Sequence, residues 1–309
     1  MSPDHPNLYS FWYRILARAA GPNSEAQASL LKCAPVEDNT YLLTVAFQSQ
    51  ERIDSIVEIQ ATANPPGFRF GCPFVRHTKS LAVSEIGNVV FHHAPDWERE
   101  KAIAFVSFKE ELSRNLGVAS DNLDYYCFES LDALLASYGI VFDARKCNWL
   151  AQDLGFLDAD GSRFVTGTGD PDFRFEYISD YLPQIAHLKG KLYPPMVMGA
   201  ATYYGGYGLS RDSLPTLKSQ FRAALLANPQ VDFLQEFRKE RGSSIQRHFT
   251  YFVISAFLYE AAIDRVGFEG AMGLACSGKE GEQFFPKLQQ TLGVTESGFH
   301  AFVVELIQA

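Results

Sequence analysis

The chain has 309 residues, of which 47% are hydrophobic and 20% charged, a composition typical of a globular protein with a sizeable core. Its formal net charge of -9 argues against nucleic acid as a partner, because phosphate binding requires a basic surface. No stretch is both long enough and apolar enough to predict a transmembrane helix. The length allows one large domain or two ordinary ones.

The cellular location is left open by the sequence. Met1–Ser10 lacks the basic and apolar regions of a signal peptide, so we expect a cytoplasmic protein or an exported one whose leader is missing from this sequence. Five widely spaced cysteines form no C-x-x-C pair, and we interpret them as buried free thiols, with one disulfide left open for an exported protein.

The first eighty residues predict a small α+β unit. Leu8–Ala19 has apolar residues at helical spacing and predicts an amphipathic helix. Strands are predicted over Tyr41–Gln48, Ile53–Gln60 and Phe68–Phe74. One helix packed on an antiparallel sheet of about three strands predicts a domain over residues 1–80.

Residues 81–309 predict a second, mainly helical domain with a small sheet. Short strands are expected at Asn88–Phe91, Asp124–Phe128 and Arg163–Thr166. Helices are expected at Trp97–Leu116, Ser130–Tyr138, Phe173–Leu188, Met196–Tyr204, Leu217–Ala227, Val231–Arg238, Ser244–Val266, Lys279–Thr291 and Thr295–Ala309. Strands followed by helices predict an α+β fold and not the alternation of a parallel α/β sheet.

Histidine spacing argues against a zinc peptidase. No two of the seven histidines have the i, i+4 spacing of H-E-x-x-H, which places two ligands on one helical face. His92 and His93 are adjacent, so in a strand they point to opposite faces and are expected to be structural. We therefore expect no metal and no cofactor.

Two polar, glycine-containing segments are interpreted as turns. Asp158–Gly161 is similar to the start of a calcium loop, but Gly169 stands where the bidentate Glu is expected, and a weak calcium site is left open. Gly167-Thr168-Gly169 lacks both the third glycine of a dinucleotide loop and the Lys of a Walker loop.

Tyr203–Gly208 consists only of tyrosines and glycines, which fits either the lining of a cleft or a helix C-cap surrounded by packed tyrosines. These tyrosines, with Asp180 or His187, also give a hydrolase of a non-zinc type as one alternative function.

Three segments after residue 85 stand in an order that resembles the gluzincin, or peptidase MA-like, domain. Asp124–Phe128 resembles its early strand with a Tyr-Tyr pattern. Pro194–Gly206 resembles the segment Glu-Gly-x-Ala-x-Tyr, whose Glu is the third zinc ligand in that family. Arg247–Val266, followed by Gly267, resembles the long apolar helix behind the site. The first domain resembles, by pattern alone, a partial cystatin-like or NTF2-like module.

The departures from the family fall on its chemistry. Where the family has H-E-x-x-H, this chain has Ser179-Asp180-Tyr181-Leu182-Pro183, and Pro183 interrupts the helix. Met198 stands at the third-ligand position, and a thioether is a poor zinc ligand. Without three ligands, no metal-bound water becomes a nucleophile.

The resemblance therefore implies a zincin-like scaffold without zinc ligands, a pseudo-peptidase. Such a protein binds a peptide or another ligand in the residual cleft, or keeps the cleft only as a scaffold. The resemblance assigns six residues to that cleft: Ser179, Asp180, Pro183, Met198, Tyr203 and Tyr204. A protein-interaction module, in which the N-terminal sheet pairs with a partner, is a further alternative.

Overall fold

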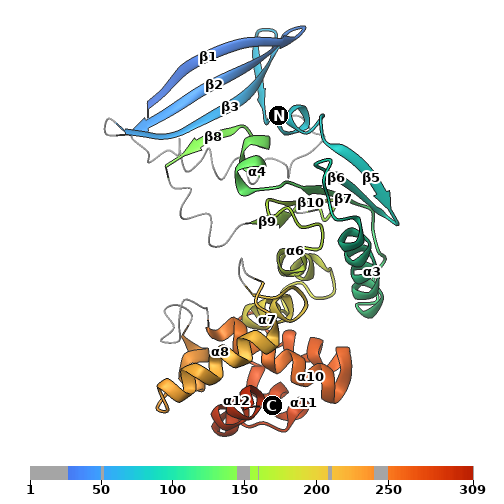
Figure 1. Ribbon diagram of the computed structural model, residues 1–309, viewed down its shortest axis with the longest axis vertical. Coiled ribbons are helices and arrows are strands. Elements are labelled where there is room, and N and C mark those ends of the chain that lie inside the picture. Colours follow the sequence, from blue (N-terminus) through green and yellow to red (C-terminus); the bar gives the residue numbers. More distant parts are fainter. Residues whose placement is uncertain are drawn as a thin grey trace. The chain divides into compact units, whose positions relative to one another are not determined.

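The structure is a computed structural model that describes residues 27–49, 52–144, 154–158, 160–207, 211–239 and 250–308. It has the predicted α+β fold, with an antiparallel sheet followed by a helical region that includes a second sheet (Figure 1). The chain divides into two compact units, Met1–Ser107 with Asp121–Asp172, and Phe108–Ser120 with Phe173–Ala309. The predicted helix Leu8–Ala19 lies outside the described residues.

The first sheet, sheet A, is antiparallel in the order β1-β2-β3-β4, and β8 pairs with β3 as well. Its strands are β1 (Gln27–Glu37), β2 (Thr40–Ser49), β3 (Arg52–Asn64), β4 (Gly67–Gly71) and β8 (Ile140–Asp143). The sequence did not predict β1. Register shifts at Leu30/Lys32 and Pro35/Glu37 break the two-residue alternation by which a strand is recognised.

The two faces of sheet A differ in chemistry. The register places Leu43, Val45, Val57 and Ile59 on one face, and we call this side the apolar face. The opposite face carries polar residues such as Thr44, Glu58 and Gln60. Buried Phe47 and Val57 form a small core on the apolar face, so this side of the sheet faces inward at that point.

The second sheet, sheet B, has the order β5-β6-β7-β10-β9. Its strands are β5 (Ala82–Ile86), β6 (Val89–His93), β7 (Leu123–Cys127), β10 (Arg163–Thr166) and β9 (Gly155–Leu157). The three central strands are parallel, and the helix α3 (Arg99–Asn115) lies between β6 and β7 in the chain, as a parallel crossover requires. The sequence predicted strands followed by helices and no βαβ unit, so this local parallel pairing was not expected.

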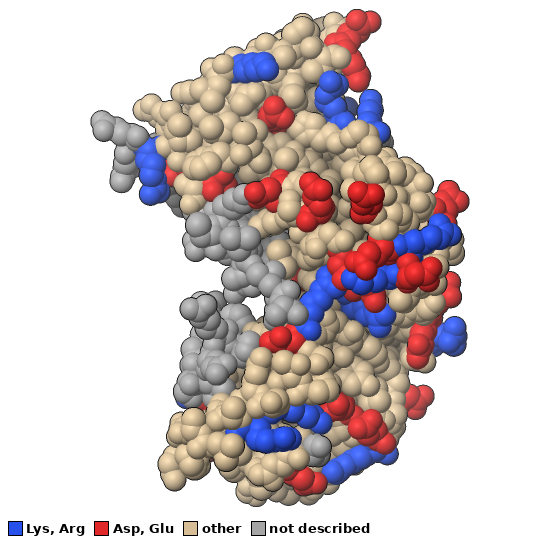
Figure 2. Space-filling view, in the orientation of Figure 1, with Lys and Arg blue, Asp and Glu red and all other residues tan. Residues whose placement is uncertain are grey.

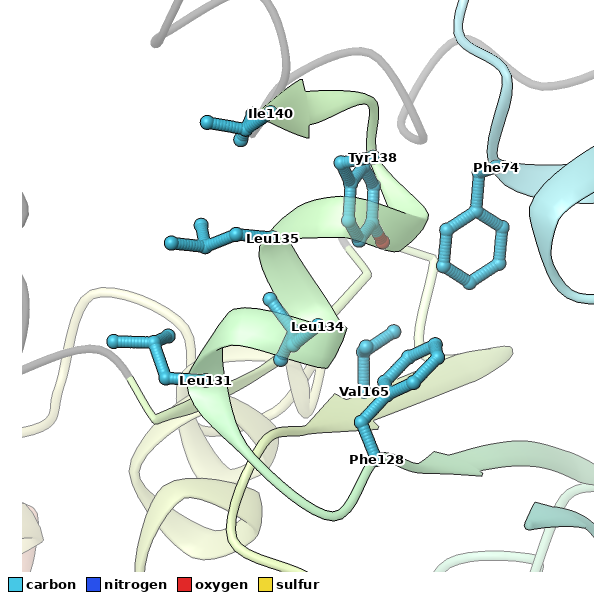
Figure 3. Close-up of a cluster of buried hydrophobic side chains, with 8 residues drawn as sticks. All are labelled: Phe74, Phe128, Leu131, Leu134, Leu135, Tyr138, Ile140 and Val165. Carbon is cyan, nitrogen blue, oxygen red and sulfur yellow. The ribbon is translucent and has the colours of Figure 1, made fainter. Parts of the chain in front are cut away.

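A core of eight buried side chains joins the two sheets within the first unit (Figure 3). It includes Phe74 from α2 (Phe74–His77), Leu134 from α4 (Leu131–Ser137), Ile140 from β8 and Val165 from β10. Ser130 caps α4 by accepting a hydrogen bond from the Ala133 N–H, as its N-cap position predicts.

The predicted domain boundary near residue 80 lies inside the first unit. Two contacts explain this. Strand β8, which follows residue 80 in the chain, pairs with β3, which precedes it. Phe74, which also precedes residue 80, packs beside Tyr138, which follows it. Both contacts cross the boundary that the change from strands to helices suggested.

The second unit is helical. It contains α6 (Arg174–Tyr181), the 3-10 turn η1 (Leu182–Gln184), α7 (Pro194–Gly205), α8 (Leu214–Ala227), α9 (Phe233–Arg238), α10 (Thr250–Ala275), α11 (Phe284–Leu292), η2 (Glu296–Gly298) and α12 (Phe299–Gln308). Pro183 separates α6 from the expected continuation to Leu188. The helix expected to end at Val266 bends at Gly267, whose φ of 75° is left-handed, and continues to Ala275.

Helix α10 is the centre of the second unit, as its apolar sequence predicted. Its residues Ile254, Phe257 and Leu258 are fully buried. None of the helices in the described ranges combines the length and the apolar character needed to cross a bilayer.

Substitution of Gly199 by Ala tests the packing of α7 on α10. A Cβ at Gly199 would lie 2.6 Å from the backbone carbon of Ser255, so the two helices must separate. We expect Gly199→Ala to lower the free energy of unfolding by about 1–3 kcal/mol in urea denaturation followed by circular dichroism.

Gly273→Ala is the matched control for this substitution. It lies in α10 with no atom within 4 Å of its added Cβ, so it should be neutral or stabilise by up to about 1 kcal/mol. Equal effects of the two substitutions would contradict the proposed closeness of α7 and α10.

Candidate functional site

Helix α7 packs between α6 and α10 in the second unit, and two glycines allow it to approach both. A Cβ at Gly205 would lie 2.4 Å from the backbone nitrogen of Phe175 in α6. A Cβ at Gly199 would meet the backbone of Ser255 in α10. The C-terminal end of α7 therefore lies at the start of α6, and the six residues predicted for a cleft all belong to these two helices or to η1.

The segment aligned with H-E-x-x-H does not lie on one helix. Ser179 and Asp180 are half-buried in the last turn of α6, whereas Pro183 is exposed in η1, beyond the end of that helix. Ser179 donates a hydrogen bond to the Glu176 carbonyl at 3.0 Å, which is a contact within its own helix. His187, the alternative to Asp180 in the hypothesis of a non-zinc hydrolase, is exposed beyond η1.

Met198 is half-buried on α7, next to the glycine that contacts α10. Met196, Val197, Ala200 and Ala201 around it are buried. Met198 is thus a partly exposed thioether on a helix whose neighbouring residues are packed into the core.

The two tyrosines of α7 belong to an aromatic cluster that includes a residue missed by the sequence interpretation, Tyr259 of α10. The ring centroids of Tyr203 and Tyr204 lie 5.4 and 6.0 Å from that of Tyr259. Phe108 of α3 lies 5.3 Å from Tyr204, and the Arg174 guanidinium lies 4.7 Å from the centroid of Phe108. The position of Tyr259 in the largely apolar run Phe252–Ala262 of the predicted helix was the available sequence signal.

Burial keeps the hydroxyl groups of this cluster protonated. It raises the pKa of Tyr204 to about 12, although a hydrogen bond with Tyr259 acts in the opposite direction. Burial also raises the pKa of Tyr203, with Asp264 and Glu260 nearby, and that of Tyr259. At neutral pH these groups are hydrogen-bond donors and acceptors and not bases, which disfavours a hydrolytic role for them.

His92 and His93 point to opposite faces of sheet B, as their adjacency predicted. The His92 ring stacks on Tyr126 at 4.0 Å, and its Nε2 lies 3.4 Å from Asp124 Oδ1. The His93 ring stacks on Trp97 at 3.8 Å, and its Nε2 lies 3.0 Å from Ser84 Oγ. Each ring is engaged in packing and in a cross-strand hydrogen bond. Within the described residues, no group of three or more potential metal ligands is present.

The aspartates of the predicted calcium-like segment have separate partners. Asp158 accepts from the Arg163 guanidinium at 3.3 Å, and this pair is buried against Phe74 and Tyr126. Asp160 accepts from the Ser162 backbone N–H at 3.0 Å. The Gly161 N–H donates to the Asp158 carbonyl, which closes a turn as predicted.

The glycines of Gly167-Thr168-Gly169 are required by contact with the chain itself. A Cβ at Gly167 would lie 2.9 Å from Leu131 Cα, at the first turn of α4. Gly169 has a φ of 70° and donates its N–H to the Phe128 carbonyl. The interpretation of this segment as a turn is in agreement with both contacts.

Comparisons of the chain with protein-family models, with curated proteins and with solved structures find no match.

Replacement of Asp158 by Asn tests the buried ion pair through the pH dependence of stability. Burial raises the pKa of Asp158 from 3.8 to about 6, although Arg163 opposes this shift. The contribution of this carboxyl to stability is therefore complete below about pH 4 and is lost as the pH rises through 6. In urea unfolding, the stability of the wild type relative to Asp158→Asn should fall by about 2–3 kcal/mol between pH 4 and 7.

Asp160→Asn is the matched control in the same turn. Burial acts to raise the pKa of Asp160, but hydrogen bonds from Ser162 outweigh burial and lower this pKa. The contribution of Asp160 to stability therefore has the opposite sign and is lost as the pH falls. A pH dependence that is the same for both variants would show that the Asp158 carboxyl is not the buried, desolvated group described above.

Proposed function

We propose that this chain is a binding protein built on a gluzincin-like scaffold that has no zinc ligands. The observation that carries the proposal is that Met198, which the resemblance aligns with the third zinc ligand, lies on a helix that packs directly against α6. Ser179 and Asp180, at two of the positions of the resembled motif, belong to α6. A packed helix pair whose side chains do not make a three-ligand set supports retention of a scaffold without its metal.

The chemistry of these side chains supports binding more than catalysis. A thioether, a hydroxyl and a single carboxylate do not make the three-ligand set that activates a zinc-bound water. The interruption of the helix after Tyr181 also removes the single helical face on which two ligands would stand one turn apart.

The proposed ligand is a peptide, or another molecule with both apolar and hydrogen-bonding groups. Met198 is unbranched and polarisable, and it adapts to apolar side chains of different shapes. Tyr203 and Tyr204 are half-buried, and their neutral hydroxyl groups can donate to or accept from a peptide backbone. The half-buried state of all three side chains supports access from solvent.

The first test is the zinc content of the purified full chain. We expect elemental analysis after incubation with zinc and dialysis to find much less than one equivalent of zinc, because the proposed scaffold has no three-ligand set. Stoichiometric zinc would overturn the proposal that the site has lost its metal.

The second test is peptide capture. The immobilised full chain is exposed to a pool of tryptic peptides from reduced casein, and retained peptides are identified by mass spectrometry. We expect binding that Met198→Ala weakens by about tenfold, which corresponds to about 1.4 kcal/mol.

Leu226→Ala serves as the matched control for the capture experiment, because Leu226 is a 77% exposed apolar residue on α8, outside the proposed site. Circular dichroism checks that both variants are folded. Capture that is absent in the wild type, or that both substitutions weaken equally, would contradict a peptide site at α6 and α7.

A further inference from the structure

Three tyrosines from two helices form the aromatic part of the candidate site, and their rings are steeply inclined to one another. The rings of Tyr203 and Tyr204 on α7 make an angle of 80°, with centroids 4.7 Å apart. The ring of Tyr259 on α10 is inclined by 51° to Tyr203 and by 69° to Tyr204. Tyr259 is fully buried and the two tyrosines of α7 are half-buried, so the rings of α7 carry the aromatic surface that a ligand can reach.

Carboxylates from α10 and α3 lie near these two tyrosines. Glu260 and Asp264 are four residues apart on α10, so they share one face of that helix. Burial raises the pKa of the Tyr203 hydroxyl, and the charges of Asp264 and Glu260 raise it further. Burial is also the main cause of the raised pKa of Tyr204, and Glu111 of α3 adds to it. The aromatic surface therefore lies in the field of three carboxylates.

Two of these carboxylates have no cationic partner in the part of the chain that the structure describes. Glu260 is paired with Lys218 of α8, whose Nζ lies 2.9 Å from its Oε2. Asp264 and Glu111 are exposed, and their side chains make neither an ion pair nor a hydrogen bond within the described residues. An unpaired carboxylate beside an aromatic surface favours a cationic ligand, because both groups attract a cation.

The same aromatic cluster already binds a cation that belongs to the chain itself. Phe108 lies 5.3 Å from Tyr204, and the Arg174 guanidinium lies 4.7 Å from the centroid of Phe108, which is a cation–π distance. Among the described residues, no Lys or Arg side chain lies over the ring of Tyr203. Tyr203, with the unpaired carboxylate of Asp264 near it, therefore offers the same kind of contact to a cation from another molecule.

We propose that this site selects peptides that carry a lysine or arginine side chain. Tyr203 and Asp264 receive the cationic group of that side chain, and Tyr204 and Glu111 extend the same surface. This inference rests on the proposed peptide-binding function and specifies which peptides are bound. The rings attract the cation and cover its alkyl stem, and the carboxylates favour it over a neutral or acidic side chain. Figure 2 shows acidic and basic side chains interspersed on that face of the molecule, so selection of a cation requires carboxylates beside the ligand and not only the net charge of -9.

Removal of the last residue from the peptides of the casein pool tests this inference. Tryptic peptides end in Lys or Arg, and carboxypeptidase B removes these residues but leaves the N-terminal ammonium in place. The immobilised full chain is exposed to equal amounts of the treated and untreated pools, and the retained peptides are quantified by mass spectrometry. We expect about tenfold less retention of the treated pool, and we expect retention of the untreated pool to fall as added salt screens the exposed carboxylates.

The double variant Asp264→Asn, Glu111→Gln removes both unpaired charges with little change in side-chain size. We expect it to retain the untreated pool about tenfold less than the wild type does. The double variant Glu280→Gln, Glu282→Gln is the matched control, because it removes two exposed carboxylates from the segment between α10 and α11. Circular dichroism checks that both variants are folded.

The outcomes separate this inference from the proposed function. Equal retention of the two pools by the wild type, or equal losses in the two double variants, would overturn the selection of a cationic side chain, whereas peptide binding would stand. If the wild type retains neither pool, peptide binding at this site is wrong and the inference is overturned with it.

Discussion

The second unit depends on the close approach of α7 to the two helices beside it. Gly199 brings α7 against the backbone of Ser255, and Gly205 brings it against Phe175. Side chains larger than hydrogen at these points would separate the helices by more than a dense core tolerates. The contacts also fix which residues of α7 are half-exposed, so the positions of Met198, Tyr203 and Tyr204 follow from two glycines that carry no chemistry themselves.

The sequence predicted the elements that have local signals. Ser130 marks the start of α4, Gly267 marks the bend after Val266, and the apolar run of α10 marks the centre of the helical unit. In each case a single residue, or one helix period, determines the structure through interactions within a few residues of chain. Such signals are visible without knowledge of the rest of the fold.

Features that depend on distant residues were not predictable in the same way. β1 lacks regular alternation because of its two register shifts, so its identity as a strand depends on pairing with β2. The parallel pairing of β6, β7 and β10 depends on the crossover through α3. In the candidate site, Tyr259 joins Tyr203 and Tyr204 only because α10 packs on α7. The helix predicted over Phe173–Leu188 ends at Tyr181, and Pro183, which the sequence already marked as an interruption, accounts for that end.

The pairing of β8 with β3 has a consequence for the order in which the chain can fold. β3 ends at Asn64, whereas β8 begins at Ile140, so the contact closes a long loop that contains four strands and three helices of the described chain. Closing such a loop costs entropy before the strand pairing repays it, and contacts of this kind form late. On the ribosome, β1 to β4 emerge well before β8, the last strand of sheet A, is synthesised. Sheet A therefore begins before sheet B in this chain but cannot be completed until most of the first unit has been made.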